Sequence, residues 1–467
     1  CGVGFVAHIR GLRSHDIVER GVGILLNLEH RGATGCDPQS GDGAGILIQV
    51  PHELLAAEVA ARFELPPPGA YGVGCVFLPR EPSARARCQQ VLEDKILGTG
   101  QRLLGWRTVP VDESALGPIA RQSAPVILQV LVGSTTDDDA SFERKLFVIR
   151  KWAERTVRES DIPDRDAFYI PSLSCRTLVY KGLLLAHQLS KFYRDLEDPR
   201  TVSALSMVHQ RFSTNTFPTW QLAQPFRLLS HNGEINTVRG NAQWMRAREQ
   251  LFDGRVFGED VRHILPTITP GGSDSAQLDN VAELLLHAGR SLPHVMMMLV
   301  PEAWQNDSNM PAYLRDFYAY HACLVEPWDG PAALTFTDGR KVGALLDRNG
   351  LRPARWLETR DGLVVLSSET GVMDVPPEQI ARKGRLEPGR MFLVDFAAGR
   401  IVEDEELKSE LARQRPYGKW LRDNAIHLDE LAEVAETPAT PSAHELLERQ
   451  RVFGYTTEDL QLVLAPM

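Results

Sequence analysis

The chain has 467 residues, 43% of them hydrophobic and 24% charged, which is the balance of a globular protein with one large domain or a few ordinary ones. Its net charge of −10 and the lack of Lys/Arg runs argue against a nucleic-acid binder, and no apolar run reaches the ~18 residues of a membrane span. Six widely spaced cysteines without a CxxC pair predict reduced thiols, no metal site and a cytoplasmic protein.

The first half of the chain mixes predicted helices and strands. Apolar residues at helical spacing predict helices at 16–29, 83–97 and 141–158. Short apolar runs bounded by glycine or proline predict strands at 45–50, 72–78, 125–132, 177–180 and 207–212. The glycine pairs complete neither GxGxxG nor a P-loop, so nucleotide binding is not supported.

The second half begins with predicted helices at 234–252 and 275–287, followed by an apolar run of strand length at 295–300. Strands are expected at 332–337, 342–346, 363–368 and 391–396, with Asp338-Gly339 at hairpin spacing. The stretch 403–436 is charged and helical in character, a linker pattern occupies 437–441, and a last helix is expected at 444–451. The irregular order of strands and helices favours α+β layers over a doubly wound sheet.

The change in composition after Val402 predicts two parts. We expect a main domain at 1–402 and a connecting helical segment, with the start of a truncated central domain, at 403–467. The sequence ends inside a mostly apolar run at 462–467, which we interpret as a truncation.

Cys1 is the first residue of the sequence, so an α-amine and a thiol belong to the same residue. In unperturbed form the amine titrates near ~8 and the thiol near ~8.5, so both lie close to neutral pH. The amine can accept the thiol's proton, directly or through a water molecule, as in enzymes with an N-terminal nucleophile. Residues 2–9 predict a strand whose glycines leave room beside Cys1. The alternatives are a chain cut at a convenient cysteine and a lipoprotein acylated at Cys1, although a lipoprotein usually continues into a polar linker.

Five short motifs follow Cys1 in order. They are Glu-His-Arg-Gly-Ala at 29–33, Ser-Gly-Asp-Gly-Ala-Gly-Ile at 40–46, Val-His-Gln-Arg-Phe-Ser-Thr at 208–214, Ser-His-Asn-Gly-Glu-Ile-Asn at 230–236 and Gly-Gly-Ser-Asp-Ser at 271–275. Together they resemble the class II, N-terminal-nucleophile glutamine amidotransferases, and most closely the amidotransferase domain of the glutamate synthase large subunit. Further matching stretches lie at 172–174, 177–182, 301–304, 326–331 and 347–353. The resemblance runs along the whole chain and implies a four-layer α/β/β/α sandwich with a helical C-terminal extension.

The resemblance implies a role for each matching residue. Cys1 would attack the side-chain amide of L-glutamine, giving a γ-glutamyl thioester and ammonia, and water would then release glutamate. Asn232 and Gly233 match the oxyanion hole, which needs two donors aimed at the tetrahedral oxygen. Arg211 matches the residue that binds the substrate α-carboxylate, and Asp274 the residue that pairs with its α-ammonium.

Each of these assignments has a simpler structural alternative. Asn-Gly is the commonest tight-turn dipeptide, Asp caps helix N-termini readily, and an Arg can serve in an ion pair. Arg31 matches an Arg near the nucleophile, where a packing role is equally plausible. Thr214 and Gly272 are expected to contribute further substrate contacts. The position of Asn215 is often His in sugar-linked amidotransferases, so Asn there fits the glutamate synthase branch.

The whole enzyme implied by the resemblance would pass the ammonia to 2-oxoglutarate. That half requires FMN, an iron–sulfur cluster and NADPH, NADH or ferredoxin, and we expect none of these cofactors to bind this chain. The expected partners are the remaining synthase domains and an electron-donating small subunit, with neither nucleic acid nor a membrane. The alternatives are another class II amidotransferase, such as one making phosphoribosylamine or asparagine, and an acylated secreted binding protein beginning at Cys1.

Overall fold

The computed structural model describes residues 1–213, 216–426, 431 and 439–467. Two compact units divide the chain, Cys1–Gly418 and Lys419–Met467. Three antiparallel sheets form the framework of the first unit. In its described residues, no helix is both long and apolar enough to cross a membrane.

The seven-stranded sheet carries the N-terminus on one of its inner strands. Its order is β14 (Ile380–Arg385), β12 (Arg355–Thr359), β13 (Leu363–Ser367), β1 (Gly2–His8), β8 (Leu205–Gln210), β2 (Ala44–Gln49) and β7 (Thr177–Gly182). Strand β1 pairs with β13 on one side and β8 on the other, so that Gly4 lies opposite Ser367 and Val208. Cys1 therefore begins at the end of a strand that is held on both edges.

A five-stranded sheet lies against one face of the seven-stranded sheet. Its order is β16 (Arg400–Val402), β15 (Met391–Asp395), β11 (Lys341–Leu346), β10 (Ala332–Thr337) and β9 (Leu229–Gly233). Phe5 and Met207 of the first sheet share a buried cluster with Phe392 and Val394 of the second. The rings of Phe5 and Phe392 lie 6.4 Å apart, centroid to centroid. These contacts form the core between the two sheets.

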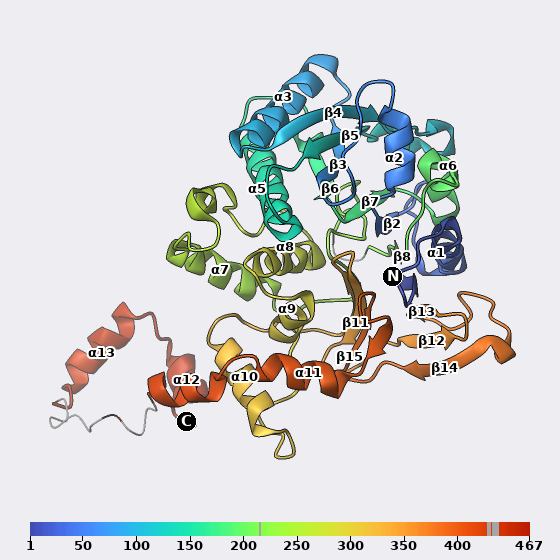
Figure 1. The fold of residues 1–467 in the computed structure, drawn as a ribbon. Coiled ribbons are helices and arrows are strands. Elements are labelled where there is room, and N and C mark those ends of the chain that lie inside the picture. Colours follow the sequence, from blue (N-terminus) through green and yellow to red (C-terminus); the bar gives the residue numbers. More distant parts are fainter. Residues whose placement is uncertain (214–215, 427–430, 432–438) are drawn as a thin grey trace. The chain divides into compact units, whose positions relative to one another are not determined.

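Helices cover the outer faces of this pair of sheets (Figure 1). Helix α1 (His15–Asn27) packs on the seven-stranded sheet through Ile17, Val18, Ile24 and Leu25. Helices α8 (Asp274–His287) and α9 (Leu292–Leu299) lie on the other side, so that β11 and β15 stand between α9 and β12. The predicted four-layer α/β/β/α arrangement is confirmed.

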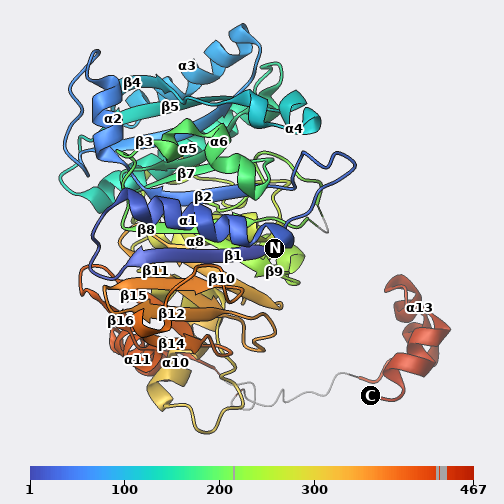
Figure 2. The same ribbon diagram turned by 90° about the vertical axis from the view of Figure 1, so that its right-hand side faces the viewer.

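A four-stranded sheet extends the first unit beyond β7 (Figure 2). Its order is β4 (Arg102–Thr108), β5 (Val126–Gly133), β3 (Tyr71–Leu78) and β6 (Tyr169–Ser174), and helices α3 (Pro82–Gly98) and α5 (Asp139–Arg158) pack on it. The remaining helices are α2 (His52–Val59), α4 (Pro118–Gln122), α6 (Leu189–Phe192), α7 (Val238–Arg248), α10 (Ala312–Ala322), α11 (Asp404–Arg413), α12 (Tyr417–Asn424) and, in the second unit, α13 (Ala443–Val452).

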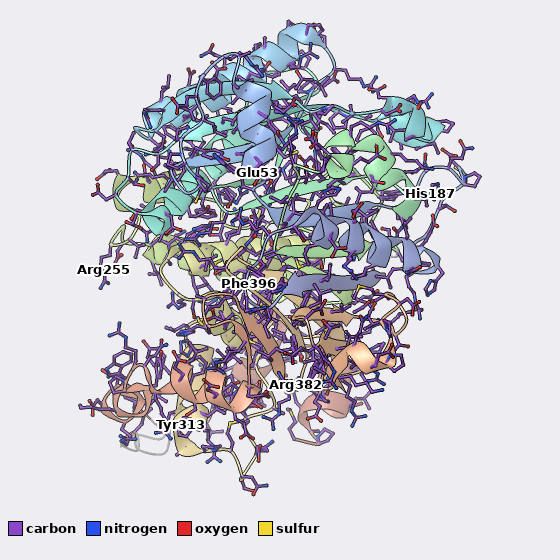
Figure 3. The ribbon with its side chains drawn as sticks, turned by 45° about the vertical axis from the view of Figure 1, so that its right-hand side comes forward. Glu53, His187, Arg255, Tyr313, Arg382 and Phe396 are labelled. Atoms are coloured by element: carbon purple, nitrogen blue, oxygen red, sulfur yellow. The ribbon has the colours of Figure 1, made fainter. Side chains whose placement is uncertain are left out.

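Strand β14 is an edge of the seven-stranded sheet, and its side chains are mostly exposed and basic. The guanidinium of Arg382 lies 5.9 Å from the ring centre of Trp356 on the neighbouring strand β12, and it also binds Glu358 (Figure 3). Charged side chains on an edge strand discourage pairing with another sheet.

Two segments differ from what the sequence suggests. The apolar run at 295–300, which has strand length, lies in helix α9 up to Leu299, and every side chain of that helix is buried. A helix that is buried on all sides has no polar face, so its apolar run cannot be told from a strand by periodicity. The helix expected at 234–252 is shorter and runs from Val238 to Arg248, while before it the amide of Asn236 bonds to the carbonyl of Asp329 at 2.8 Å.

The chain after Val402 is helical in part. Helix α11 packs on α10 and β15 within the first unit, where Lys408 reaches Glu302 at 2.9 Å and the Gly389 carbonyl at 2.8 Å. The C-terminal part of the helical stretch predicted at 403–436, apart from residue 431, and the first two residues of the linker predicted at 437–441 lie outside the described residues. The division of the chain at Val402 into an amidotransferase domain and a connecting segment stays a prediction.

Candidate active site

The thiol of Cys1 lies against the backbone of Phe212, just beyond the end of β8. The amide of Phe212 donates to Cys1 Sγ at 3.3 Å, and Sγ lies 3.5 Å from the carbonyl oxygen of Phe212. The glycines after Cys1 are closely packed as well, because a β-carbon on Gly2 would lie 3.0 Å from Cβ of Leu28, and one on Gly4 would lie 2.9 Å from the carbonyl of Leu366. Strand β1 therefore requires glycine at both positions next to its neighbours.

The α-amine of Cys1 has its pKa lowered to about 6. Burial is the largest cause, followed by the positive charges of Arg352 and Arg31, while the carboxylate of Glu369 acts in the opposite direction. Because an amine with this pKa is mostly neutral at pH 7, it can accept a proton from the neighbouring thiol.

A cavity of about 340 Å³ contains Cys1 and three more of the residues singled out in the sequence. Its wall includes Arg211, Gly233 and Asp274, which come from the end of β8, the end of β9 and the start of α8. Its volume is at the lower end of the range for small-molecule sites. The fold therefore gathers segments more than 270 residues apart in the sequence around the first residue.

Arg211 is buried, with 4% of its surface exposed. Its Nη2 donates to Thr216 Oγ1 at 2.8 Å, but its Nη1 has no hydrogen-bond partner in the part of the chain that the structure describes. Burial lowers the pKa of Arg211, and the carboxylates of Asp42 and Asp274 oppose that effect. A guanidinium remains charged in any case, so a buried donor is left for an anionic group in the cavity.

Asp274 is the first residue of α8, but it does not cap the helix. Ser273 is the N-cap and accepts from the amide of Ala276 at 3.3 Å. Asp274 instead accepts from the amides of Ile235 at 3.0 Å and Ser275 at 2.6 Å. Burial alone would raise the pKa of Asp274, but the imidazole of His231 and the two amides outweigh it and hold the pKa well below its usual value. The cavity therefore has a fixed negative charge.

Asn232 and Gly233 form the end of strand β9 rather than a hairpin turn, and they pair with Ala333 and Ala332 of β10. Gly233 has a φ of 138° and lines the cavity, while Asn232 precedes it and is half-buried, outside the lining. This Asn-Gly pair therefore does not form the tight turn that was its structural alternative.

Two other predicted site residues, Arg31 and Gly272, do not line this cavity. Arg31 is half-exposed and paired with Glu369. Its positive charge helps to lower the pKa of the Cys1 amine. Gly272 lines a separate cavity of about 310 Å³, and its carbonyl accepts from Gln277 Nε2 at 2.9 Å. Thr214 lies outside the described residues, as does Asn215.

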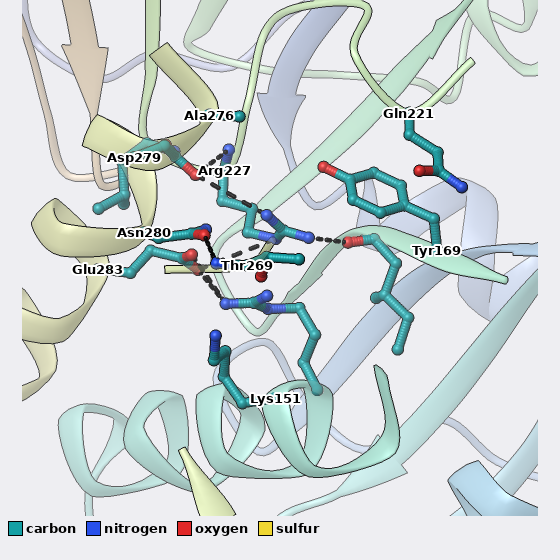
Figure 4. A network of polar contacts seen from close by, with 12 residues as sticks. Lys151, Tyr169, Gln221, Arg227, Thr269, Ala276, Asp279, Asn280 and Glu283 are labelled. Carbon is teal, nitrogen blue, oxygen red and sulfur yellow. Dashed lines mark hydrogen bonds and ion pairs between the residues drawn. The ribbon is translucent and has the colours of Figure 1, made fainter. Parts of the chain in front are cut away.

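The segment that leads to Asp274 is tied to buried polar groups on α5 and α8. Lys151 donates to the carbonyls of Pro266 at 2.7 Å and Thr267 at 2.8 Å, and Asn280 accepts from the amide of Thr269 at 2.9 Å. Beside them, Arg227 pairs with Glu154 at 3.1 Å. Its guanidinium also lies 3.9 Å from the carboxylate of Asp279 (Figure 4).

A second arginine completes this buried network. Arg150 pairs with Glu154 at 3.0 Å and with Glu283 of α8 at 2.7 Å. Each of these side chains is less than 10% exposed, and the basic groups are matched by acidic ones, as buried charges require. The network holds α8, and with it Asp274, against α5.

Sequence reasoning missed several residues of the cavity. His231, Gln224 and Ser273 line it, and Asp42 accepts from the amide of Ser213 at 2.6 Å beside it. His231, Ser273 and Asp42 lie inside motifs that were singled out, so their proximity to the site could have been inferred from their neighbours. Gln224 had no such signal.

The four layers, with Cys1 at the start of an inner strand and beside a cavity, are those of the N-terminal-nucleophile fold. The family model described as glutamine amidotransferases class-II matches residues 1–420. The chain belongs to the class-II glutamine amidotransferases, which are enzymes.

Relatives match the chain over its whole length. It is 48% identical to the glutamate synthase [NADPH] large chain of Bacillus subtilis (strain 168), 44% to the glutamate synthase [NADH] of Schizosaccharomyces pombe (strain 972 / ATCC 24843) and 43% to the ferredoxin-dependent glutamate synthase 2 of Synechocystis sp. (strain ATCC 27184 / PCC 6803 / Kazusa). All of this chain aligns in each case, and it spans 30%, 23% and 30% of those proteins.

Proposed function

We propose that this chain is the glutaminase part of a glutamate synthase, which hydrolyses L-glutamine to L-glutamate and ammonia through a thioester on Cys1. One observation carries the proposal. The Cys1 thiol, beside an amine of pKa about 6, shares a cavity with a buried arginine and a half-buried carboxylate. A nucleophile, a base and two opposite charges are what the hydrolysis of a free amino-acid amide requires.

Substrate recognition follows from the two opposite charges of Arg211 and Asp274. The α-carboxylate of glutamine binds the guanidinium of Arg211 through the unpartnered Nη1, and the α-ammonium binds the carboxylate of Asp274. A peptide-bound glutamine has neither charged group, so the site selects the free amino acid. Thr214 and Gly272 are proposed as further substrate contacts.

Catalysis begins when the Cys1 amine takes the thiol proton and the thiolate attacks the carbonyl carbon of the side-chain amide. The tetrahedral oxygen receives hydrogen bonds from the Asn232 side chain and the Gly233 amide, and Arg31 adds positive charge near the nucleophile. The C–N bond breaks, the protonated amine gives its proton to the leaving nitrogen, and ammonia departs. Water then attacks the thioester, which releases glutamate and restores the thiol.

In a complete glutamate synthase the ammonia would pass to 2-oxoglutarate in the remaining domains, which would also hold FMN and the iron–sulfur cluster. These domains and an electron-donating small subunit are the proposed partners. We place the protein in the cytoplasm, where it would take part in nitrogen assimilation. The relatives named above, at 43–48% identity, are named for three different donors, NADPH, NADH and ferredoxin. Another class-II amidotransferase is the alternative.

Labelling with 6-diazo-5-oxo-L-norleucine, a glutamine analogue with an electrophilic carbon, tests the proposal. Mass spectrometry should find the adduct on Cys1, and glutamine should protect against it. Cys1→Ala should abolish glutaminase activity, whereas Cys36→Ala, at an exposed thiol, should leave it unchanged. An extra Met before Cys1, which moves the amine, should lower the rate nearly as far as Cys1→Ala. Glutamine hydrolysis at the full rate by that extended form would contradict the role of the amine.

A further inference from the structure

Strand β14 is the outermost strand of the seven-stranded sheet, and among the described residues only β12 pairs with it (Figure 1). The amides and carbonyls of its outer edge are therefore available to another chain. Side chains alternate between the two faces of a strand. Arg382 lies on the face that carries Trp356, so Lys383 and Arg385 lie on the opposite face.

A groove of about 490 Å³ lies over that opposite face. Leu357 of β12 is opposite Lys383, and it shares a buried cluster with Val365 and with Ile17 of α1, so the groove is on the side of the sheet where α1 packs. The groove wall includes the apolar side chains of Leu357 and Val365 together with the basic ones of Lys383 and Arg385. An apolar floor is thus bordered by positive charge.

The basic side chains of the groove lack acidic partners. Arg355, which also lines the groove, lies directly opposite Arg385 across β12 and β14. Neither these two nor Lys383 has a side-chain hydrogen bond or ion pair in the part of the chain that the structure describes. Glu369, an acidic residue of the groove wall, is paired with Arg31 instead. Like charges directly opposite each other destabilise a pair of strands, so this arrangement indicates a negative partner from outside.

The spacing of the charges matches an extended chain. Lys383 and Arg385 are two residues apart on β14. On a strand this corresponds to about 6.8 Å, and a strand added beside β14 has the same period. Acidic residues at every second position of such a strand would therefore meet both cations. A small dianion would leave the edge of β14 unpaired, so the free edge favours a peptide.

We propose that the edge of β14 and the groove beside it bind an acidic peptide segment of a partner protein. The segment adds to the sheet as an extra strand, with alternate Asp or Glu residues against Lys383, Arg385 and Arg355. Charges that discourage pairing with a neutral or basic strand select an acidic one. Backbone hydrogen bonds to β14 supply affinity, and the groove receives side chains of the segment. The surface shares no residue with the cavity of Cys1, so the proposal is independent of the glutaminase function.

Fluorescence anisotropy with the labelled peptide acetyl-Glu-Val-Glu-Val-Glu-Val-Glu-amide tests the proposal on the full chain. Binding should weaken as NaCl is raised from about 0.05 M to about 0.5 M, because exposed charges are screened. Lys383→Glu combined with Arg385→Glu should weaken binding at least about tenfold. The same double variant should instead bind the peptide in which every Glu is replaced by Lys. No binding by wild type, or equal affinity of wild type and this variant for the acidic peptide, would overturn the proposal.

Two further ligands separate strand addition from simple charge attraction. The acidic peptide with every backbone amide nitrogen methylated keeps its carboxylates but cannot donate hydrogen bonds to β14, so it should bind at least about tenfold more weakly. Sodium glutarate, a small dianion, should not displace the unmodified peptide at constant ionic strength. Equal binding of the methylated peptide, or displacement by glutarate, would overturn the proposal, and the second result would assign the groove to a small molecule.

Two controls address net charge and folding. Arg87→Glu combined with Arg255→Glu reverses two exposed charges outside the groove and should leave the affinity for the acidic peptide unchanged. An equal loss in this control would show that net charge alone attracts the peptide and would overturn the proposal. Arg385→Glu places opposite charges at the pair with Arg355, so its thermal unfolding midpoint should not fall below that of wild type. A lower midpoint would contradict the unpaired like charges on which the proposal rests.

Discussion

The carbonyl oxygen of Pro331 lies 1.9 Å from the position that a β-carbon on Gly233 would occupy. Gly233 also has a φ of 138°, a backbone conformation that residues with a β-carbon rarely adopt. Both features come from the tight pairing of β9 with the first residue of β10. The amide proposed for the oxyanion hole can therefore be presented only by glycine.

Gly233→Ala should lower kcat by at least about 100-fold, because the new β-carbon must displace the end of β9 and its amide. Glutamine hydrolysis by stopped assay measures this loss. Gly240→Ala is the matched control, since a β-carbon at Gly240, within α7, meets nothing within 4 Å. Near-normal activity in Gly233→Ala would mean that this amide does not take part.

Asn232→Ala should lower kcat by about 10²–10³ with KM little changed, because an oxyanion donor acts mainly in the transition state. Steady-state kinetics with glutamine separate the two constants. Asn232 lies outside the lining of the empty cavity, so this variant also tests whether its side chain reaches the reacting atoms. A raised KM with unchanged kcat would assign Asn232 to substrate binding instead.

The sequence predicts those elements whose side chains are buried on a regular pattern. Strands β2, β3, β10 and β11 are apolar runs ended by turn residues, and each lies within a residue or two of its expected position. Strand β14 has no apolar run in the sequence, because its side chains are mostly exposed and basic. It is a strand because it pairs with β12. The apolar run in helix α9 has strand length, and because its burial is complete its periodicity does not distinguish a helix from a strand.

The site was predicted unevenly for a similar reason. Family motifs pointed to Cys1, Arg211, Gly233 and Asp274, and the cavity brings these four together. Gln224 could not be found in this way, because its place beside Ser275 arises from packing between distant segments. The sequence also does not show which residue caps α8, since Ser273 and Asp274 are both good caps.

Arg150→Met should destabilise the first unit by about 3–5 kcal/mol, because it leaves Glu154 and Glu283 buried without this partner. Urea denaturation followed by circular dichroism measures the change. Arg255→Met is the control, since that side chain is 88% exposed and its pairing with Asp253 should contribute little. Equal stability of the two variants would show that the buried network is not needed to hold α8.

Arg211→Lys should raise KM for glutamine with the fold intact, because lysine keeps the charge but loses the planar fork that binds a carboxylate at two points. The expected rise is at least about tenfold. Titration with a glutamine analogue whose α-carboxylate is replaced by an amide checks the assignment, since wild type should bind it poorly and Arg211→Lys should discriminate less. Unchanged discrimination would leave Arg211 with a structural role at Thr216.

Activity should depend on pH through the Cys1 amine, which must be neutral to act as a base. With a pKa of about 6, kcat/KM for glutamine should rise from about pH 5 to about pH 7 and then level off. Arg352→Gln removes a positive charge that disfavours the protonated amine, so its pKa should rise and the limb should move to higher pH. Glu369→Gln removes the opposing negative charge, so the limb should move to lower pH. Profiles of kcat/KM against pH, measured at constant ionic strength, test both variants. A shift of both profiles in the same direction would show that the amine is not the group that titrates.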